Sequence, residues 1–309
     1  MMSASVSQRD ALLTEIYNRA KVDRDVIFIS ADMGAPALDL IRRDLPGQFF
    51  NAGISEQNAI LVASGLALEK KKVFTFAIAS FITINCLEKI RVQMSVMKLP
   101  VQIIGVGGGF SYCDSGPTHH GIEDVAVMRA FPGIEILNIS SAENARVAAN
   151  FCFEHPNTPR YIRLDRESFN HVPGEGEMNF YTGFRVLHQG GTEKLLLITG
   201  NLVEKAPAIA KANPTMTIVE VGRLDRVHEF FRNEIAKYSQ VICLEEHFIN
   251  GGLGTLIVET VMDHNLPCRV QRMGLNPVNG YSYKYGGRDV LRKDFGLNLD
   301  HLLGEKVTS

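Results

Sequence analysis

Short apolar runs of strand length alternate with helical patterns along most of this chain. Strand-like runs occupy residues 26–32, 73–78, 101–108, 134–139 and 160–164, and helical patterns lie between them, including residues 57–71, 81–97 and 142–154. This alternation predicts strands joined by helical crossovers, which gives a mainly parallel sheet with helices on both faces. The chain has 309 residues, of which 45% are hydrophobic, enough for a large buried core.

The alternation stops at residues 167–192, "ESFNHVPGEGEMNFYTGFRVLHQGGT", where glycine and polar residues dominate. It restarts with the run "KLLLITG" at residues 194–200 and continues towards the C-terminus. Composition shifts of this kind are typical of a linker between domains or an embellished crossing. We therefore expect an α/β fold of two doubly wound domains with mainly parallel sheets, at residues 1–175 and 186–309.

The overall composition excludes several classes of function. The formal net charge is -2, and no long basic run is present, so neither nucleic acid nor an anionic membrane is an expected partner. The apolar segments are too short to span a bilayer, and the N-terminus has no signal-peptide core, so we expect a cytoplasmic protein. The five cysteines are odd in number and contain no CxxC pair, so they indicate neither a disulfide framework nor a zinc site.

Ligands of open parallel sheets tend to bind beyond the carboxyl ends of the strands, so candidate residues are sought in those turns. The stretch "NAGISEQNA", residues 51–59, places Glu56 between a glycine turn and a long apolar segment. A glutamate in the first turn of a helix, after Ser55 as a cap, can also have a purely structural role at the positive end of the helix dipole. On spacing alone, the structural interpretation is favoured.

A second candidate segment is "VGGGFSYCDSGPTHHGIED", residues 106–124. It lacks the third glycine of the dinucleotide fingerprint, and the chain has no P-loop sequence. A hydrolytic triad of Ser115, His119 and Asp124 is disfavoured because no G-x-S-x-G nucleophile elbow is present. On this evidence alone, a pair of polar loop residues or hydrogen-bonded packing histidines is the favoured explanation of His119 and His120.

The conjunction of these segments points to one family. "FFNAGISEQNA", "SFITINCLEKIRVQMSVMKLPV", "DSGPTHHGIEDVAVMRAFPGIEIL" and "YIRLDR", in this order, resemble the pyrimidine-binding domain of transketolases and deoxyxylulose phosphate synthases. The part from "KLLLITG" through "EEHFINGGLG" is similar to their C-terminal domain. The resemblance covers about residues 10–300. It is specific, because G-I-x-E-Q followed by G-P-T-H-[QH]-G at this separation is rare by chance.

The resemblance implies thiamine diphosphate as the cofactor. In the family a glutamate hydrogen-bonds N1′ of the cofactor's pyrimidine and thereby promotes removal of the thiazolium C2 proton. Glu56 matches that glutamate, and the apolar residues after it suit a carboxyl group that shares a proton with the ring. Phe81 matches the aromatic residue that stacks on the pyrimidine, and Asp32 matches an acidic position near the thiazolium. A core phenylalanine and a solvated strand-end aspartate are the structural alternatives.

The resemblance also assigns residues to the substrate. His119 matches the histidine that faces the substrate's hydroxyls and carbonyl, which suits proton transfer or polarisation. Arg166 matches an arginine that binds the phosphate of sugar phosphates, although a surface ion pair would also explain it. Ser115 stands on the substrate side where the family usually carries aspartate, and Gly107 stands where transketolases carry histidine and the synthases arginine. Both changes imply a bulkier or less hydroxylated ketose or sugar derivative.

The family's diphosphate-binding domain, with its G-D-G sequence, is not found in this chain. The resemblance therefore implies the C-terminal half of a split transketolase, in which an N-terminal transketolase-like subunit binds the diphosphate and supplies the ligands of Mg²⁺. We expect an α2β2 assembly that transfers a two-carbon ketol unit from a sugar or sugar phosphate.

Two alternatives remain open at this stage. One is a subunit that decarboxylates pyruvate and transfers an acyl unit, like deoxyxylulose phosphate synthases or the β-subunits of 2-oxoacid dehydrogenases. The other is a non-catalytic scaffold subunit that keeps the fold. Release of carbon dioxide separates the first alternative from ketol transfer, and retention of Glu56, His119 and Arg166 argues against the second.

Overall fold

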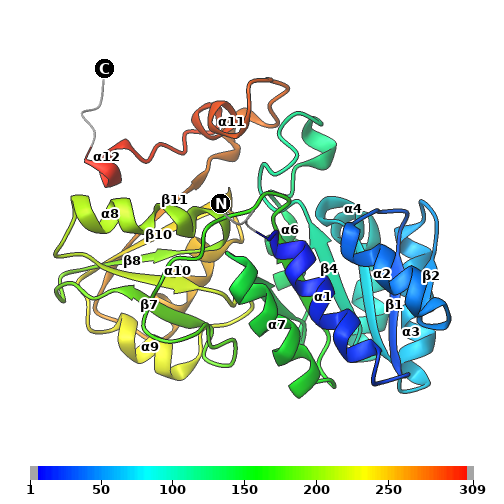
Figure 1. Ribbon diagram of the computed structural model, residues 1–309. Helices are drawn as coiled ribbons and strands as arrows, with labels where there is room; N and C mark the ends of the chain where they lie inside the picture. The colour runs from blue at the N-terminus through cyan, green and yellow to red at the C-terminus, as the bar shows by residue number, and fades with distance from the viewer. Residues whose placement is uncertain (1–5, 305–309) are drawn as a thin grey trace, which may run out of the picture.

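The computed structural model describes residues 6–304 and contains two α/β units that lie side by side (Figure 1). The first unit is built on a six-stranded sheet in the order β2-β1-β3-β4-β6-β5, in which all neighbouring strands are parallel. Every residue of β1, β4 and β6 is buried, as expected for strands covered on both faces. The strands are β1 (Val26–Ser30), β2 (Phe49–Asn51), β3 (Lys72–Ile78), β4 (Gln102–Val106), β5 (Glu135–Asn138) and β6 (Arg160–Leu164).

Helices cover both faces of this sheet. Residues of α1 (Gln8–Ala20), α2 (Pro36–Asp44) and α7 (Ala142–Glu154) share one apolar cluster with one face of the strands. The other face packs against a second cluster that includes α3 (Glu56–Leu68), α5 (Leu87–Ile90) and α6 (Asp124–Arg129). The arrangement is doubly wound, and its loops at the carboxyl ends of the strands carry the candidate residues.

The prediction of a single helix over residues 81–97 is wrong. The structure has α4 (Ala79–Thr83), a 3-10 turn (Ile84–Cys86), α5 and a π-helical turn (Arg91–Val96) in succession. The β-branched run Ile82, Thr83, Ile84 lowers α-helical propensity here. The Thr83 hydroxyl also donates to the Ala79 carbonyl at 2.6 Å. Changes of helical pitch of this kind often occur at functional sites.

The second unit is built on a five-stranded mixed sheet in the order β11-β10-β8-β9-β7, in which β7 alone is antiparallel to its neighbour. Its strands are β7 (Phe184–His188), β8 (Lys194–Ile198), β9 (Thr217–Val221), β10 (Gln240–Phe248) and β11 (Arg269–Leu275). Its helices are α8 (Ala206–Ala212), α9 (Glu229–Ile235), α10 (Leu253–Asp263), α11 (Arg288–Asp294) and α12 (Asp300–Leu303). The fold class expected from the sequence, two α/β domains with mainly parallel sheets, is confirmed.

The two units share a continuous interior. One apolar cluster contains residues of α3 and α6 together with residues of β8, α9 and α10. The edge strand β5 is hydrogen-bonded to the backbone of the second unit. Asn138 N donates to Gly222 O and Leu224 N donates to Ile136 O, both at 2.9 Å. These bonds cover the outer edge of the first sheet. Within residues 6–304, no helix has the length and apolar character needed to cross a membrane.

Candidate active site

The predicted site residues follow the carboxyl ends of the strands of the first sheet. Because the strands are parallel, these ends meet at one edge, the position expected for ligands of such sheets. In chain order, the residues are Asp32 after β1, Glu56 after β2, Phe81 after β3, Ser115 and His119 after β4, and Arg166 after β6.

Glu56 is the first residue of α3 and is buried, with 8% of its surface exposed. Its carboxylate accepts no side-chain hydrogen bond from the residues that the structure describes, and its oxygens are not among the fully buried unpartnered atoms, so they keep some contact with solvent. The carboxylate is therefore open to a hydrogen-bond donor from a ligand. Burial and, secondarily, the charge of Glu56 raise the pKa of the Cys86 thiol to about 12.

Phe81 and His119 come into contact at the next strand ends. Their ring centroids lie 4.9 Å apart with an interplanar angle of 64°, an edge-to-face arrangement. The Ser80 hydroxyl donates to the Thr118 carbonyl at 3.0 Å. This bond joins α4 to the histidine loop, residues 107–121, which carries His119. Cys86 in turn donates to the Phe81 carbonyl at 3.5 Å. Cys86 and Phe81 thus join the segment after β3 to the loop of His119.

A cavity of about 520 Å³ opens beside this cluster. It is lined by Phe81 and His120 of the first unit and by Tyr281 and Tyr283 of the second. His120 is only 2% exposed, and neither ring nitrogen makes a hydrogen bond of good geometry with residues 6–304. Burial is the largest effect on His120 and lowers its pKa, so the imidazole is neutral at pH 7.

The histidine loop, residues 107–121, is fixed at its base. Gly109 and Gly121 exchange two backbone hydrogen bonds, of 2.7 and 3.0 Å. Arg163 donates to the Gly121 carbonyl at 2.8 Å, and the N–H of Phe110 donates to the carboxylate of Glu246 at 2.8 Å. Because Glu246 lies on β10, the second unit holds the loop that carries His119.

Tyr112 is the residue at this edge that the sequence analysis did not identify. Its ring centroid is 6.1 Å from that of His119, and the guanidinium carbon of Arg166 lies 5.3 Å from the Tyr112 ring centroid. Arg166 is exposed and forms no ion pair with the residues that the structure describes, so its guanidinium can bind an anion. Gly107, at φ +104°, lies against the ring of Tyr112. The motif comparison identifies Gly107 as a departure from the family, but only the structure shows that the Tyr112 ring lies beside it.

Asp32 and Ser115 stand at the margins of this group. Asp32 is exposed, has a φ of 53°, and exchanges two hydrogen bonds of 3.2 Å with the side chain of Asn51. No contact links it to Phe81 or His119 among the described residues. Ser115 is exposed, and its N–H donates to the Tyr112 carbonyl at 2.9 Å. The roles assigned to both residues stay predictions.

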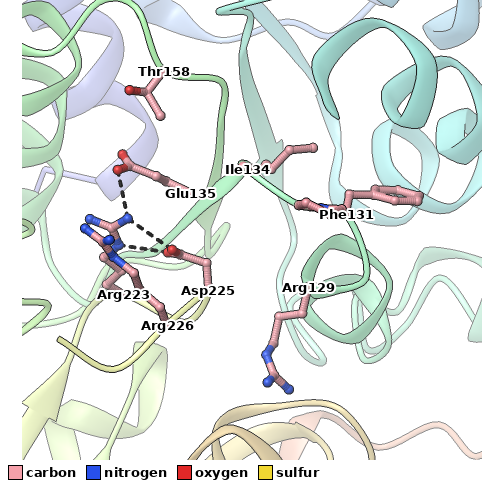
Figure 2. Close-up of a pocket in the computed structure, with 10 residues that line it drawn as sticks. Arg129, Phe131, Ile134, Glu135, Thr158, Arg223, Asp225 and Arg226 are labelled. Carbon is pink, nitrogen blue, oxygen red and sulfur yellow. Dashed lines mark hydrogen bonds and ion pairs between the residues drawn. The ribbon is translucent and has the colours of Figure 1, made fainter. Parts of the chain in front are cut away.

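A second cavity, of about 390 Å³, lies at the opposite edge of the sheet, near the amino ends of β5 and β6 (Figure 2). Its charged groups largely neutralise one another, because Arg223 pairs with Glu135 at 2.8 Å and with Asp225 at 2.9 Å. Arg129 on its rim pairs with Glu259 at 2.5 Å. None of the predicted site residues lines this cavity, which belongs to the seam between the two units.

The residues at the carboxyl edge fit a thiamine-type cofactor. Glu56 offers a buried carboxylate without a partner among the described residues, and half-buried Phe81 offers a ring beside a cavity large enough for a pyrimidine. Among residues 6–304, no three His, Cys, Asp or Glu side chains are grouped so that they could hold a metal ion.

Comparison with known proteins gives a consistent result over both units. The family model of the transketolase pyrimidine-binding domain matches residues 4–171, and that of the transketolase C-terminal domain matches residues 184–302. One subunit of the apulose-4-phosphate transketolase of Phocaeicola vulgatus is 29% identical, covering 92% of this chain and 93% of that protein. One subunit of the 6-deoxy-6-sulfo-D-fructose transketolase of a Clostridium species is 27% identical, covering 96% and 92%.

Among solved structures, a split-gene transketolase described as an inactive β4 tetramer superposes with a TM-score of 0.81. It is 25% identical to this chain, and the match covers 97% of both chains. The relatives that match along their whole length are therefore single subunits of divided enzymes.

Proposed function

This chain belongs to the transketolase family of transferases, and we propose that it is the pyrimidine-binding subunit of a two-chain transketolase that transfers a two-carbon ketol unit. The observation that carries the proposal is Glu56, a residue 8% exposed that begins α3 at the same sheet edge as Phe81 and His119 and whose carboxylate has no hydrogen-bond partner among the described residues. A carboxylate in this position is open to a ligand that donates a hydrogen bond to it.

Thiamine diphosphate, when bound, would supply the nucleophilic carbon for ketol transfer. The chain's own residues would place and protonate the reacting groups. Glu56 would hold a proton at N1′ of the pyrimidine, Phe81 would stack against that ring, and Asp32 would stand towards the thiazolium. His119 would move a proton at the substrate's carbonyl or hydroxyl oxygen, and Arg166 would bind the substrate's anionic end.

The proposal requires a partner that holds the diphosphate and Mg²⁺, and the surface of this chain supports one. Helix α3, which begins with Glu56, exposes Leu61, Val62 and Leu68 by 41, 40 and 59%. Ile54, just before the helix, is 87% exposed. Apolar side chains gathered on a helix next to a site mark a protein interface. The partner would cover this helix, and we propose an α2β2 assembly.

The substrate side differs from that of ordinary transketolases. Gly107 and Ser115 replace a charged side chain and an acid, and two relatives are named for apulose 4-phosphate and 6-deoxy-6-sulfofructose. We propose a phosphorylated or otherwise anionic ketose derivative as the substrate. Higher turnover with xylulose 5-phosphate than with any modified ketose would contradict this assignment.

The test uses this chain purified as a complex with its diphosphate-binding partner. Glu56→Gln should lower kcat by about 10² to 10⁴-fold, as expected for loss of proton transfer, while the complex still assembles. Glu69→Gln, at the exposed C-terminal end of the same helix, is the matched control and should keep full activity. Glu56→Gln turning over at the wild-type rate would refute the proposal. Release of carbon dioxide from pyruvate would instead favour acyl transfer.

A further inference from the structure

We propose that Tyr112 is a substrate-binding residue that sets which ketoses this subunit accepts, by presenting its ring to the carbons between the reacting carbonyl and the anionic end. The inference rests on the proposed function and adds the specificity of the same site. It is carried by the place of the ring, which lies between His119 and Arg166.

The ring of Tyr112 contacts both predicted substrate residues. The His119 ring lies 6.1 Å away at an interplanar angle of 59°, and the Arg166 guanidinium lies 5.3 Å from the ring centroid. One phenol ring is therefore adjacent both to the group that would act on the carbonyl and to the group that would bind the anion. A ketose that spans these two groups passes along that ring.

The position of the ring depends on Gly107. A Cβ atom added to Gly107 would come within 2.4 Å of the Tyr112 ring, a distance that heavy atoms do not adopt. A side chain at residue 107 and the Tyr112 ring thus exclude each other. Related enzymes carry histidine or arginine at this position. Here such a side chain would clash with the Tyr112 ring, which occupies that space.

The presence of a tyrosine ring beside Gly107 changes the chemistry of the substrate side of the site. Burial is the largest effect on Tyr112 and raises its pKa, so the side chain is a neutral phenol at pH 7. The Tyr112 ring lies beside Gly107, where the family carries histidine or arginine, and Ser115 stands where the family carries aspartate, so two more strongly polar side chains for sugar hydroxyls are missing here. An apolar ring face suits C–H groups and branches. The matching substrate is an anionic ketose whose middle carbons are branched or carry fewer hydroxyls.

The experiment compares donors of different length in the complex with the diphosphate-binding partner. Xylulose 5-phosphate and fructose 6-phosphate have carbons that reach past His119, whereas hydroxypyruvate does not. Tyr112→Ala should raise KM for each ketose phosphate at least tenfold or change their kcat/KM ratio by that factor. Its kcat/KM for hydroxypyruvate should fall by a clearly smaller factor than that for either ketose phosphate, and its affinity for thiamine diphosphate should stay within twofold of wild type. Tyr112→Phe keeps the ring and should stay within threefold on every donor.

Tyr181→Ala, which removes a tyrosine exposed by 55% in the second unit, is the matched control and should change nothing. Unchanged ketose kinetics in Tyr112→Ala, or equal losses on hydroxypyruvate and the ketose phosphates, would overturn the proposal.

Hydrogen exchange separates this inference from the proposed function. Residues 107–121 of the wild-type complex should gain protection on addition of fructose 6-phosphate, and Tyr112→Ala should lose that gain. If these protection changes are seen but the complex transfers no ketol unit, the transketolase reaction is refuted and the role of Tyr112 is supported. Equal protection in both proteins would overturn the role of Tyr112.

Discussion

Replacement of Glu246 should reveal how the second unit holds the histidine loop. Its carboxylate is buried on β10, accepts hydrogen bonds from Phe110 N and Asn201 at 2.8 Å, and pairs with Arg292. The Arg288 guanidinium lies 3.5 Å from the same carboxylate. Burial alone would raise the pKa of Glu246, but Arg288 and Arg292 outweigh it and hold the pKa below its ordinary value.

The expected magnitude follows from what the variant leaves behind. Removing one partner of a buried ion pair costs about 3–5 kcal/mol. Here Arg288 keeps Asp165 at 2.8 Å and Arg292 keeps Asp289 at 2.9 Å, which places this contribution near the lower end, about 3 kcal/mol. The N–H of Phe110 also loses its acceptor, at about 1–3 kcal/mol. Glu246→Ala should therefore lower the free energy of unfolding by roughly 4–6 kcal/mol.

Urea unfolding followed by circular dichroism measures this change. Because the folded-state pKa of Glu246 is lowered from 4.5, its contribution is complete above about pH 4.5 and is lost as pH falls through the folded pKa. Glu246→Gln removes the charge and keeps the shape, so its difference from wild type should shrink below that pH. Glu259→Gln breaks a half-exposed ion pair and should cost under about 1 kcal/mol. A loss below about 1 kcal/mol in Glu246→Ala would refute the reasoning.

Two further changes test other buried contacts. His247 is buried, and burial lowers its pKa to about 4. Its contribution to the free energy of unfolding is therefore complete above the ordinary pKa of 6.5, and about 3 kcal/mol is lost as pH falls towards 4. Urea unfolding of His247→Gln at a series of pH values should lack that part of the acid dependence. Gly107→Ala should destabilise by about 2 kcal/mol more than Gly133→Ala, because both glycines have positive φ but only Gly107 meets the Tyr112 ring; equal losses in urea unfolding would show that backbone strain explains the whole effect.

The sequence predicted those elements that carry strong local signals. Residues 142–154 and 160–164 form α7 and β6 with the expected bounds. The start of α7 is marked by Ser141, whose hydroxyl accepts a hydrogen bond from Asn144 N. Residues 160–164 have the continuous run of a strand buried on both faces. In both cases a few neighbouring residues contain the information that defines the element.

Elements stabilised by their surroundings were not predicted. Strand β2 has three residues at the edge of the sheet, and helix α2 has only nine. For α2 a signal existed, because Pro36 at the first helical position precedes the buried residues Leu38 and Ile41 at helical spacing. Strand β7 lies within the stretch interpreted as a linker or crossing, and only pairing with β9 defines it.

The candidate site divides in the same way. Glu56, Phe81, His119 and Arg166 lie in recognisable segments, and their place at one sheet edge follows from parallel topology. Tyr112 lies within one of these segments but was overlooked, since its meaning comes from the ring's contact with Gly107 and not from a motif.

The contact between Glu246 and Phe110 joins residues 136 positions apart, so no local pattern could show it. This contact changes the role that can be given to the second unit. Sequence resemblance assigns it mainly to assembly, yet Glu246 fixes the loop of His119, and Tyr281 and Tyr283 line the cavity beside Phe81. A second unit that shapes the cleft in this way would couple any change in its packing to substrate affinity. Variants at Glu246 should therefore alter KM for ketoses as well as the free energy of unfolding.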